Sequence, residues 1–403
     1  MAVYAYVAKT PDGKKVESII RAETKGAAQA ELKRKNLTVS SISEKKKGQG
    51  IFGPPRPHVK TKDIAVMTRQ LSTMISSGIP LLESMEILQE QASDPGFKLT
   101  LDKVIDRVRS GSDFSSALGE HKIFTKIYVN MIKAGEASGQ LDTILSRLAD
   151  YMENIEELKR EIKAAMTYPV ISLLLILGIT VFLVVGIVPK FEAIFDQLGM
   201  KDLPPPTRIL LLMSRALREH AFIVVGVLIA ICIAFVMYIR TKMGQWQWHW
   251  FLLHMPVFGP LFRKVAISRF SRTFATLIQS GVPMLGALDI VASTAGNILV
   301  EDAVLKAKDA VTRGETLGDP LAATRVFPPM VTRMIAIGEK TGALEKLLMK
   351  IAEFYDQEVR ATVKGLTSLI EPLMVGTMGL IVGFIVLSIF LPIIKIQQQL
   401  SSK

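Results

Sequence analysis

The chain carries one unit twice, at a fixed offset of 203 residues (272 − 69). The stretch RQLSTMISSGIPLLESMEIL at 69–88 returns as RTFATLIQSGVPMLGALDIV at 272–291, and the same offset places Pro169 onto Pro372 without a gap. Each copy runs from a polar stretch with helical spacing directly into a charge-free apolar run. A duplicated unit of this kind is predicted to be a soluble module joined to its own membrane anchor.

Three apolar runs without any charged residue set the class of protein. They cover 170–188, 221–239 and 372–394. A helix of 19 residues, the length of the shorter runs, covers about 28 Å at about 1.5 Å per residue, which matches a hydrocarbon core of about 30 Å. Buried helices of soluble proteins rarely run so long without a charge. We therefore predict a mainly α-helical, polytopic membrane protein with transmembrane helices at 167–189, 221–239 and 371–394.

The distribution of Lys and Arg predicts the orientation in the membrane. Of the 49 such residues, 26 lie in 1–165 and 16 in 240–370, which places both segments in the cytoplasm. Arg215 and Arg218 oppose this rule before the second span, as does Lys395 after the third. We expect the amino terminus inside and the carboxyl terminus outside.

The net charge of +12 does not predict nucleic-acid binding, because basic and acidic residues alternate at helical spacing without an aromatic-rich strand. Attraction to anionic membrane lipids explains the excess of basic residues. The single cysteine, Cys232, excludes a disulfide within the chain and a four-cysteine metal site. The amino terminus has no long apolar run after a basic start, so we expect no cleavable signal peptide.

Residues 1–43 are predicted to form a small β-β-α-β module, with a Pro11-Asp12-Gly13 turn between alternating strands and a helix at 24–36. Residues 44–60 are rich in Lys, Gly and Pro and are expected to be a flexible linker. Between the spans we expect an external helical hairpin at 190–220 and an interfacial connection at 240–263. Residues 395–403 would form a carboxyl-terminal tail.

Residues 61–166 and 264–370 are predicted to be two tandem cytoplasmic helical bundles, whose last helices run on towards the spans. Glycine accepts the positive φ that ends a helix, and proline suits the start of the next one. Structural turns are therefore predicted at Gly78, Pro80, Gly135 and Gly139, and in the second copy at Gly281, Pro283, Gly338 and Gly342.

The sequence offers no catalytic constellation. GEKT at 338–341 resembles part of a phosphate-binding loop, but Glu339 stands where the loop needs glycine. The histidines are not paired at metal-ligand spacing. We predict a non-catalytic chain without cofactor or metal. Small residues at helix-packing spacing in the spans would pack within the chain, against a second copy or against another membrane protein: Gly226, Ala230, Ala234, Gly379 and Gly383.

The paired SGxP turns at 77–80 and 280–283 and the paired GExxG turns at 135–139 and 338–342 are fairly specific. Together with FPPM at 327–330 and LPPPTR at 203–208, they show that nearly the whole chain resembles the type II secretion F family, and its type IV pilus branch most closely. The resemblance implies a platform in the bacterial inner membrane. It would contact a hexameric cytoplasmic motor ATPase, pilins and other inner-membrane pilus components.

On that resemblance, Glu136 and Glu339 become candidate contacts of the motor, although both could simply cap helices. Glu371, at the cytoplasmic edge of the third span, could pair with a membrane partner or reach into the interface. The duplication suits a homodimer. Two alternative functions remain: the platform of a type II secretion system, and a membrane-anchored scaffold or signalling protein without a motor.

Overall fold

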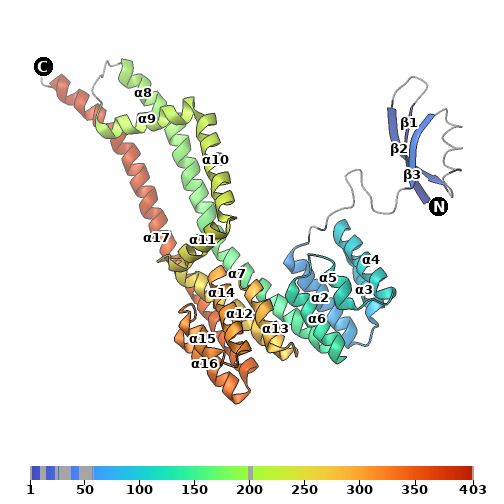
Figure 1. The fold of residues 1–403 in the computed structure, drawn as a ribbon. Coiled ribbons are helices and arrows are strands. Elements are labelled where there is room, and N and C mark those ends of the chain that lie inside the picture. Colours follow the sequence, from blue (N-terminus) through green and yellow to red (C-terminus); the bar gives the residue numbers. More distant parts are fainter. Residues whose placement is uncertain are drawn as a thin grey trace. The chain divides into compact units, whose positions relative to one another are not determined.

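The computed structural model describes residues 2–9, 15–22, 26, 38–44, 57, 59–197 and 203–401. The fold is mainly helical and divides into two compact units, Met1–Glu153 and Asn154–Lys403 (Figure 1).

The amino-terminal residues form a three-stranded antiparallel sheet of β1 (Ala2–Lys9), β2 (Lys15–Ala22) and β3 (Thr38–Glu44). β1 lies in the middle and pairs with both neighbours, and its register with β3 shifts between Val7 and Ala8. The alternating sequence of the strands suits this pairing. The turn predicted at 11–13, the helix predicted at 24–36 apart from Gly26, and most of the linker predicted at 44–60 lie outside the described residues.

The first helical bundle consists of α2 (Thr61–Ser76), α3 (Leu81–Gln91), α4 (Pro95–Arg109), α5 (Phe114–Gly119), α6 (Lys126–Ser138) and the start of α7 (Leu141–Phe182). Gly78, with a φ of 86°, ends α2 and lets the next amide donate to the carbonyl of Met74 (3.0 Å). Pro80 directly precedes α3. The helices enclose a core of fully buried side chains, among them Leu71, Leu101, Leu118, Ile132 and Leu145.

The second bundle consists of α12 (Gly259–Gln279), α13 (Met284–Thr294), α14 (Ile298–Thr312), α15 (Gly318–Ala323), α16 (Pro329–Thr341) and the start of α17 (Leu344–Ser401). Gly281 has a φ of 81°, and Pro283 precedes α13. Phe274, Val304, Leu321, Ile335 and Leu348 are fully buried. Each lies 203 residues after a core residue of the first bundle named above, so the repeat in sequence is a repeat of the fold.

The two copies differ where the first helix begins. The start of α2, shifted by 203 residues, falls at 264, but α12 begins at Gly259, five residues earlier. The preceding connection, expected to be interfacial, forms helix α11 (Lys242–His254). The second bundle therefore has a longer first helix than the first bundle.

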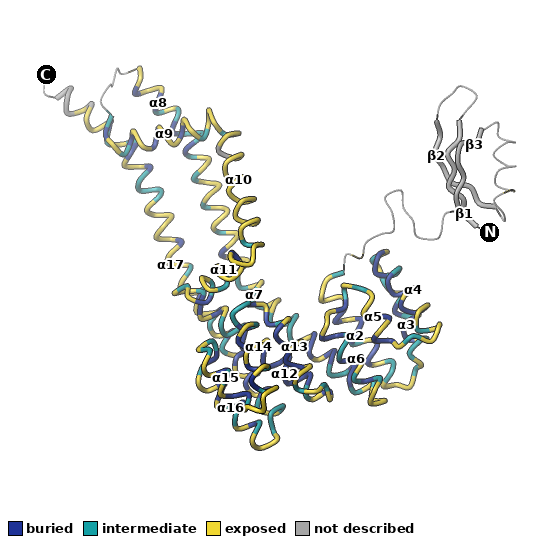
Figure 2. The backbone as a smooth tube through the Cα atoms, in the orientation of Figure 1, coloured by how far each residue is buried: buried dark blue, intermediate teal, exposed yellow. Residues whose placement is uncertain are grey.

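In the described part of the chain, three helices are long and apolar enough to cross a membrane: Leu141–Gln197, Ala221–Ile239 and Leu344–Lys395. The first contains α7, a short π-helix η1 (Leu183–Ile187) and α8 (Val188–Gln197); the second is α10, and the third is α17. Their apolar segments are mostly exposed (yellow in Figure 2). Such continuous apolar surface is stable in lipid and not in water. Helix α9 (Pro205–Glu219) lies in the segment between the first two spans.

Candidate functional site

Each bundle contains an Arg–carboxylate pair that joins its first helix to its last. In the first bundle, the guanidinium of Arg69 on α2 donates to both carboxylate oxygens of Glu153 on α7 (2.8 and 2.6 Å). It also donates to Asp150, one turn earlier. The hydrogen bond from Arg69 lowers the pKa of Glu153. The side chains of Arg69, Asp150 and Glu153 are 36%, 59% and 47% exposed. This first pair thus lies on the surface.

The second bundle has the same pair in a buried setting. Arg272 and Asp356 lie 203 residues after Arg69 and Glu153, and they form an ion pair whose side chains are only 10% and 15% exposed. Asp356 also accepts a hydrogen bond from the hydroxyl of Ser268. A buried ion pair depends on full pairing, because either charge left alone is poorly solvated.

The segment of α7 that follows residue 153 covers the second pair. Ile155 and Leu158 line a cavity of about 120 Å³ together with Arg272 and Asp356. Further along α7, Leu158, Ile162 and Ala165 pack against a buried cluster formed by Leu261 on α12 with Val359, Val363 and Leu366 on α17. This part of α7 therefore lies over α12 and α17 and buries the pair between them.

The equivalent segment of α17 lacks the side chains with which α7 covers the second pair. The positions on α17 equivalent to Ile155, Leu158 and Ile162 are Glu358, Ala361 and Gly365. These residues lack the large apolar side chains that pack onto the second bundle. The two copies therefore share a fold but differ in the surface that they leave exposed.

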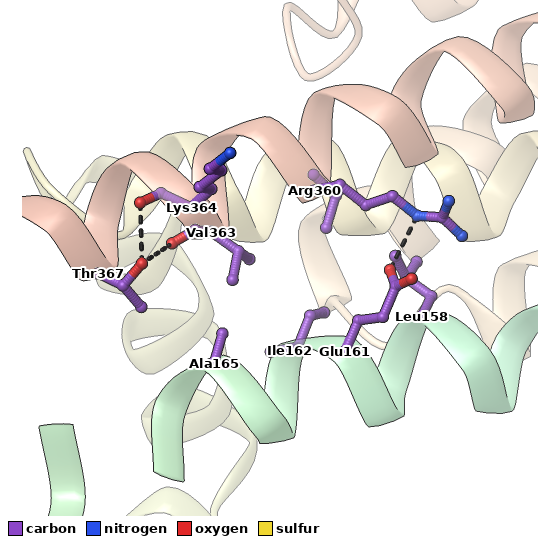
Figure 3. A pocket seen from close by; sticks show the side chains of 9 residues that line it. Leu158, Glu161, Ile162, Ala165, Arg360, Val363, Lys364 and Thr367 are labelled. Atoms are coloured by element: carbon purple, nitrogen blue, oxygen red, sulfur yellow. Dashed lines mark hydrogen bonds and ion pairs between the residues drawn. The ribbon is translucent and has the colours of Figure 1, made fainter. Parts of the chain in front are cut away.

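Ion pairs connect α7 and α12 to α17 near the start of the spans. Arg360 on α17 contacts Glu161 on α7 (2.8 Å), as Figure 3 shows. It also contacts Glu157 on α7 (3.2 Å). Glu157 and Arg360 occupy the same position of the repeated unit, because they are 203 residues apart. On the other side of α17, the ammonium of Lys264 donates to Glu358 (2.7 Å) and Thr362 (2.9 Å). Both α7 and α12 are thus tied to α17.

At the opposite ends of the spans, α9 joins the first span to the third. The hydroxyl of Ser214 donates to the carbonyl of Val184 (2.7 Å), in the π-helix, where the regular backbone hydrogen-bond pattern changes. The hydroxyl of Thr207 donates to the carbonyl of Ser388 on α17 (2.5 Å). A buried apolar cluster that includes Leu210 and Ile385 surrounds these contacts.

The same segment contains the arginines that oppose the positive-inside rule. Arg215 forms an ion pair with Glu192 on α8, and Arg218 lies 3.7 Å from the same carboxylate, which is 10% exposed. One carboxylate therefore offsets part of their charge. The positive-inside rule counts Lys and Arg and not net charge, so Arg215 and Arg218 still oppose an external α8–α9 segment.

The candidate motor contacts Glu136 and Glu339 are engaged inside their own bundles. The Glu136 carboxylate accepts hydrogen bonds from the amides of Phe114 (2.5 Å) and Ser115 (3.1 Å), at the start of α5. Glu339 accepts one from the amide of Leu317 (2.8 Å), next to the start of α15. Carboxylates satisfy the free amides at helix amino termini. The geometry favours the capping alternative over a motor contact.

The predicted GExxG turns are shorter than expected. Gly139 and Gly342, both with a φ of 69°, end α6 and α16, but Gly135 and Gly338 lie inside those helices, so assigning them to turns was wrong. A Cβ on Gly338 would lie 2.8 Å from the Cα of Leu344, and one on Gly135 would lie 3.1 Å from the Cβ of Ile144. These glycines permit close contact with the following helix.

The predicted residues of the spans make few contacts in the described part of the chain. Glu371 is exposed, and so are Ala230 and Ala234. A Cβ added to Gly226, Gly379 or Gly383 would meet no atom within 4 Å of the described residues. A role in helix packing thus stays a prediction that concerns a second copy or another membrane protein. Among the described residues, no group of three or more His, Cys, Asp or Glu is placed to hold a metal ion.

These features define a class of protein: a duplicated helical membrane protein in which the last helix of each bundle continues into a span. Residues 67–189 and 270–392 each match the family described as type II secretion system (T2SS), protein F, and residues 1–43 match its N-terminal domain. The chain belongs to the type II secretion system protein F family.

Its relatives include proteins of pili and of secretion systems. The chain is 44% identical over 407 residues to the type IV pilus assembly protein PilC of Thermus thermophilus, with all of both chains covered. It is 42% identical over 397 residues to PilC of Myxococcus xanthus, covering 98% of this chain and 95% of the relative. It is 32% identical over 410 residues to the type II secretion system protein F of Vibrio cholerae, again with both chains fully covered.

Proposed function

We propose that this chain is the inner-membrane platform of a type IV pilus machine, which couples a cytoplasmic motor ATPase to the insertion or removal of pilin subunits at the fibre base. The observation that carries the proposal is the continuity of α7 and α17. Each is a single helix that begins in a bundle and ends as a span. A displacement of the bundle is therefore passed directly to the membrane segment. The two pilus assembly relatives, at 42% and 44% identity, support the choice of machine.

The proposal assigns the motor contact to the first bundle. Its exposed face consists of Val66, Arg69, Asp150 and Glu153 and is here called the first-bundle face. The positions equivalent to Val66, Arg69 and Glu153 line the cavity that α7 covers in the second bundle. A surface with a fixed ion pair and an exposed apolar side chain suits a protein partner. The assignment replaces Glu136 and Glu339, whose carboxylates already cap helices.

On this proposal the amino terminus and the bundles at 61–166 and 264–370 are cytoplasmic, and 190–220 and the carboxyl terminus face the periplasm. The chain transmits work that a separate ATPase generates, and it catalyses no reaction of its own. A homodimer would present two first-bundle faces to a symmetric hexameric motor. The secretion relative, at 32% identity over the full length, keeps the platform of a type II secretion system as the second candidate.

The experiment deletes the gene and restores it with variants of α7. Lys159 is exposed on α7 between the first bundle and the span. Lys159→Pro removes a backbone hydrogen bond and kinks the helix, whereas Lys159→Ala leaves both the hydrogen bond and the straight helix intact. We expect surface fibres to be absent with Lys159→Pro and present with Lys159→Ala, at equal membrane levels of the two variants. Normal fibres with Lys159→Pro would contradict coupling through α7. Normal fibres in the deletion strain with lost protein secretion would favour the secretion platform.

A further inference from the structure

Helix α11 joins the second span to the second bundle. Arg240 and Thr241 are the two residues between the end of α10 and the start of α11, and the hydroxyl of Thr241 caps α11 by accepting a hydrogen bond from the amide of Gly244 (3.0 Å). A Cβ on Gly244 would collide with the carbonyl of Tyr238, so the glycine permits this sharp turn. Figure 1 shows α11 between the end of α10 and the second bundle, and it contacts α10, α12 and α14.

Side-chain contacts place the middle of α11 level with the last turn of the span. The ring of Trp248 packs edge-on against the ring of Phe235 on α10, with centroids 5.3 Å apart. The hydroxyl of Tyr238, also on α10, donates to the side-chain carbonyl of Gln247. Phe235 precedes the end of α10 at Ile239 by four residues (239 − 235), or about 6 Å of helix. α11 therefore lies at the depth where the charge-free run meets the lipid headgroups.

One side of α11 leaves large apolar side chains uncovered at this depth. Met243, Trp246, Trp250 and Phe251 are 72%, 46%, 45% and 47% exposed. The first three follow spacings of three and four residues, which place them on one face of the helix. Tryptophan prefers the headgroup layer, where its apolar ring and its polar N–H both find partners. The uncovered face thus fits a lipid surface.

The charges of α11 fit the same partner. Arg240 and Lys242 are both exposed where the span ends and α11 begins. Basic side chains at this level attract the phosphates of lipid headgroups. The sequence of α11 contains no acidic residue, so the helix itself has no charge that would repel those phosphates.

Another side of α11 contacts the second bundle. Leu253 is buried, and Nδ1 of His249 accepts a hydrogen bond from the amide of Ile298 (3.1 Å), the first residue of α14. The side chain of Asn297 accepts one from the next amide, that of Leu299 (2.9 Å). The first amides of a helix need such acceptors from outside the helix. His249 therefore caps α14 from a neighbouring helix.

α11 thus has one side for the bundle and one for the membrane. We propose that α11 binds the lipid headgroup layer through Trp246 and Trp250 and holds the start of α14 at the membrane through His249. All three tryptophans of the chain lie in α11, so the first copy of the repeat has none and the anchor distinguishes the two bundles. The anchor does not depend on which machine the chain serves.

The test uses tryptophan fluorescence of the full-length protein in nanodiscs of phosphatidylcholine and phosphatidylglycerol. Trp248→Phe with Trp250→Phe keeps Trp246, and Trp246→Phe with Trp248→Phe keeps Trp250. In both variants, a nitroxide on the lipid headgroup should cause a larger loss of fluorescence than a nitroxide near the middle of the acyl chain or iodide in the water. Leu228→Trp, in a chain with all three tryptophans replaced by phenylalanine, is the control for depth, because Leu228 is exposed in the middle of α10.

Three results would overturn the anchor. Quenching by iodide without quenching by the headgroup nitroxide would place α11 in water. Quenching that is strongest with the acyl-chain nitroxide, as expected for Leu228→Trp, would place α11 in the hydrocarbon core. Protection from all three quenchers would mean that a protein, such as a second copy of the chain, covers the aromatic face.

A second measurement tests the link to α14. His249→Phe removes the acceptor and should raise hydrogen exchange at the start of α14 about fivefold, the effect of one hydrogen bond. His249→Asn keeps an acceptor and should restore slow exchange. His254→Phe is the matched control, because His254 bonds to the carbonyl of Trp250 in its own helix. Unchanged exchange in His249→Phe, or an equal rise in His254→Phe, would overturn the link.

Discussion

The repeat supplies a matched pair of substitutions with very different expected costs. Asp356→Ala removes the partner of Arg272, whose side chain is only 10% exposed, so a buried charge is left unpaired. Such a loss destabilises by about 3–5 kcal/mol. Glu153→Ala removes the equivalent carboxylate from Arg69, which is 36% exposed and keeps Asp150 as a partner. An exposed pair contributes about 0–1 kcal/mol.

The assay follows from the position of the three tryptophans, all in α11 of the second unit. Their fluorescence on heating reports unfolding of the second unit. In a domain of this size, each kcal/mol of lost stability lowers the midpoint of thermal unfolding by about 2–4 °C, so Asp356→Ala should lower it by on the order of 10 °C. Hydrogen exchange in α2 reports the first bundle and should change less than about fivefold with Glu153→Ala. The double variant Arg272→Met with Asp356→Leu should recover most of the lost stability. Equal effects of the two single substitutions, or no recovery, would refute the reasoning.

Three further predictions concern packing, the α9 contact and pH. Gly338→Ala places a Cβ 2.8 Å from the backbone of Leu344 and should destabilise by about 1–3 kcal/mol, whereas Gly365→Ala, with open space around it, should be neutral or stabilising when unfolding is followed by tryptophan fluorescence. Ser214→Ala leaves a buried carbonyl of the π-helix without its hydroxyl donor and should cost about 1–3 kcal/mol in the same assay; an unchanged midpoint would show that the contact is dispensable. Burial raises the pKa of Tyr128 to about 12, so the folded bundle keeps the phenol neutral while the unfolded chain ionises near pH 10. Its stabilising contribution, complete below pH 10, should fall as the pH rises towards 12. Burial also raises the pKa of Tyr355, so absorbance at 295 nm should show late tyrosine titration in the folded protein, and Tyr128→Phe should remove only part of it.

Sequence alone predicts much of the architecture, because its strongest signals are local or periodic. The 203-residue offset predicts two like bundles, and the matching helix starts, such as Leu81 and Met284, follow it. Charge-free length predicts the three spans, since this property needs no knowledge of neighbours. The continuation of the last helix of each bundle into a span also follows from uninterrupted helical spacing.

The rest depends on which residues meet in space. From sequence, Glu339 is predicted to be a surface carboxylate in a turn. The structure shows instead that it accepts a hydrogen bond next to the start of α15. Gly338 is predicted from sequence to be a turn residue. It lies in a helix, where the lack of a side chain permits close contact with Leu344, and this contact depends on the tertiary packing. Arg272 is more buried than Arg69 because Ile155, Leu158 and Ile162 of α7 pack onto the second bundle. The equivalent positions on α17 lack such large apolar side chains. A sequence comparison of the two copies at these positions could have found this difference.

The most direct test of the central claim measures capture of the motor. Asp150 on the first-bundle face and Glu353 in the second bundle are equivalent carboxylates, 59% and 48% exposed. Full-length protein with Asp150→Lys or Glu353→Lys is used to pull down the assembly and retraction ATPases of the same organism. The account predicts that Asp150→Lys loses about tenfold or more in capture, whereas Glu353→Lys captures normally. Normal capture by Asp150→Lys, or loss confined to Glu353→Lys, would contradict a motor contact on the first bundle.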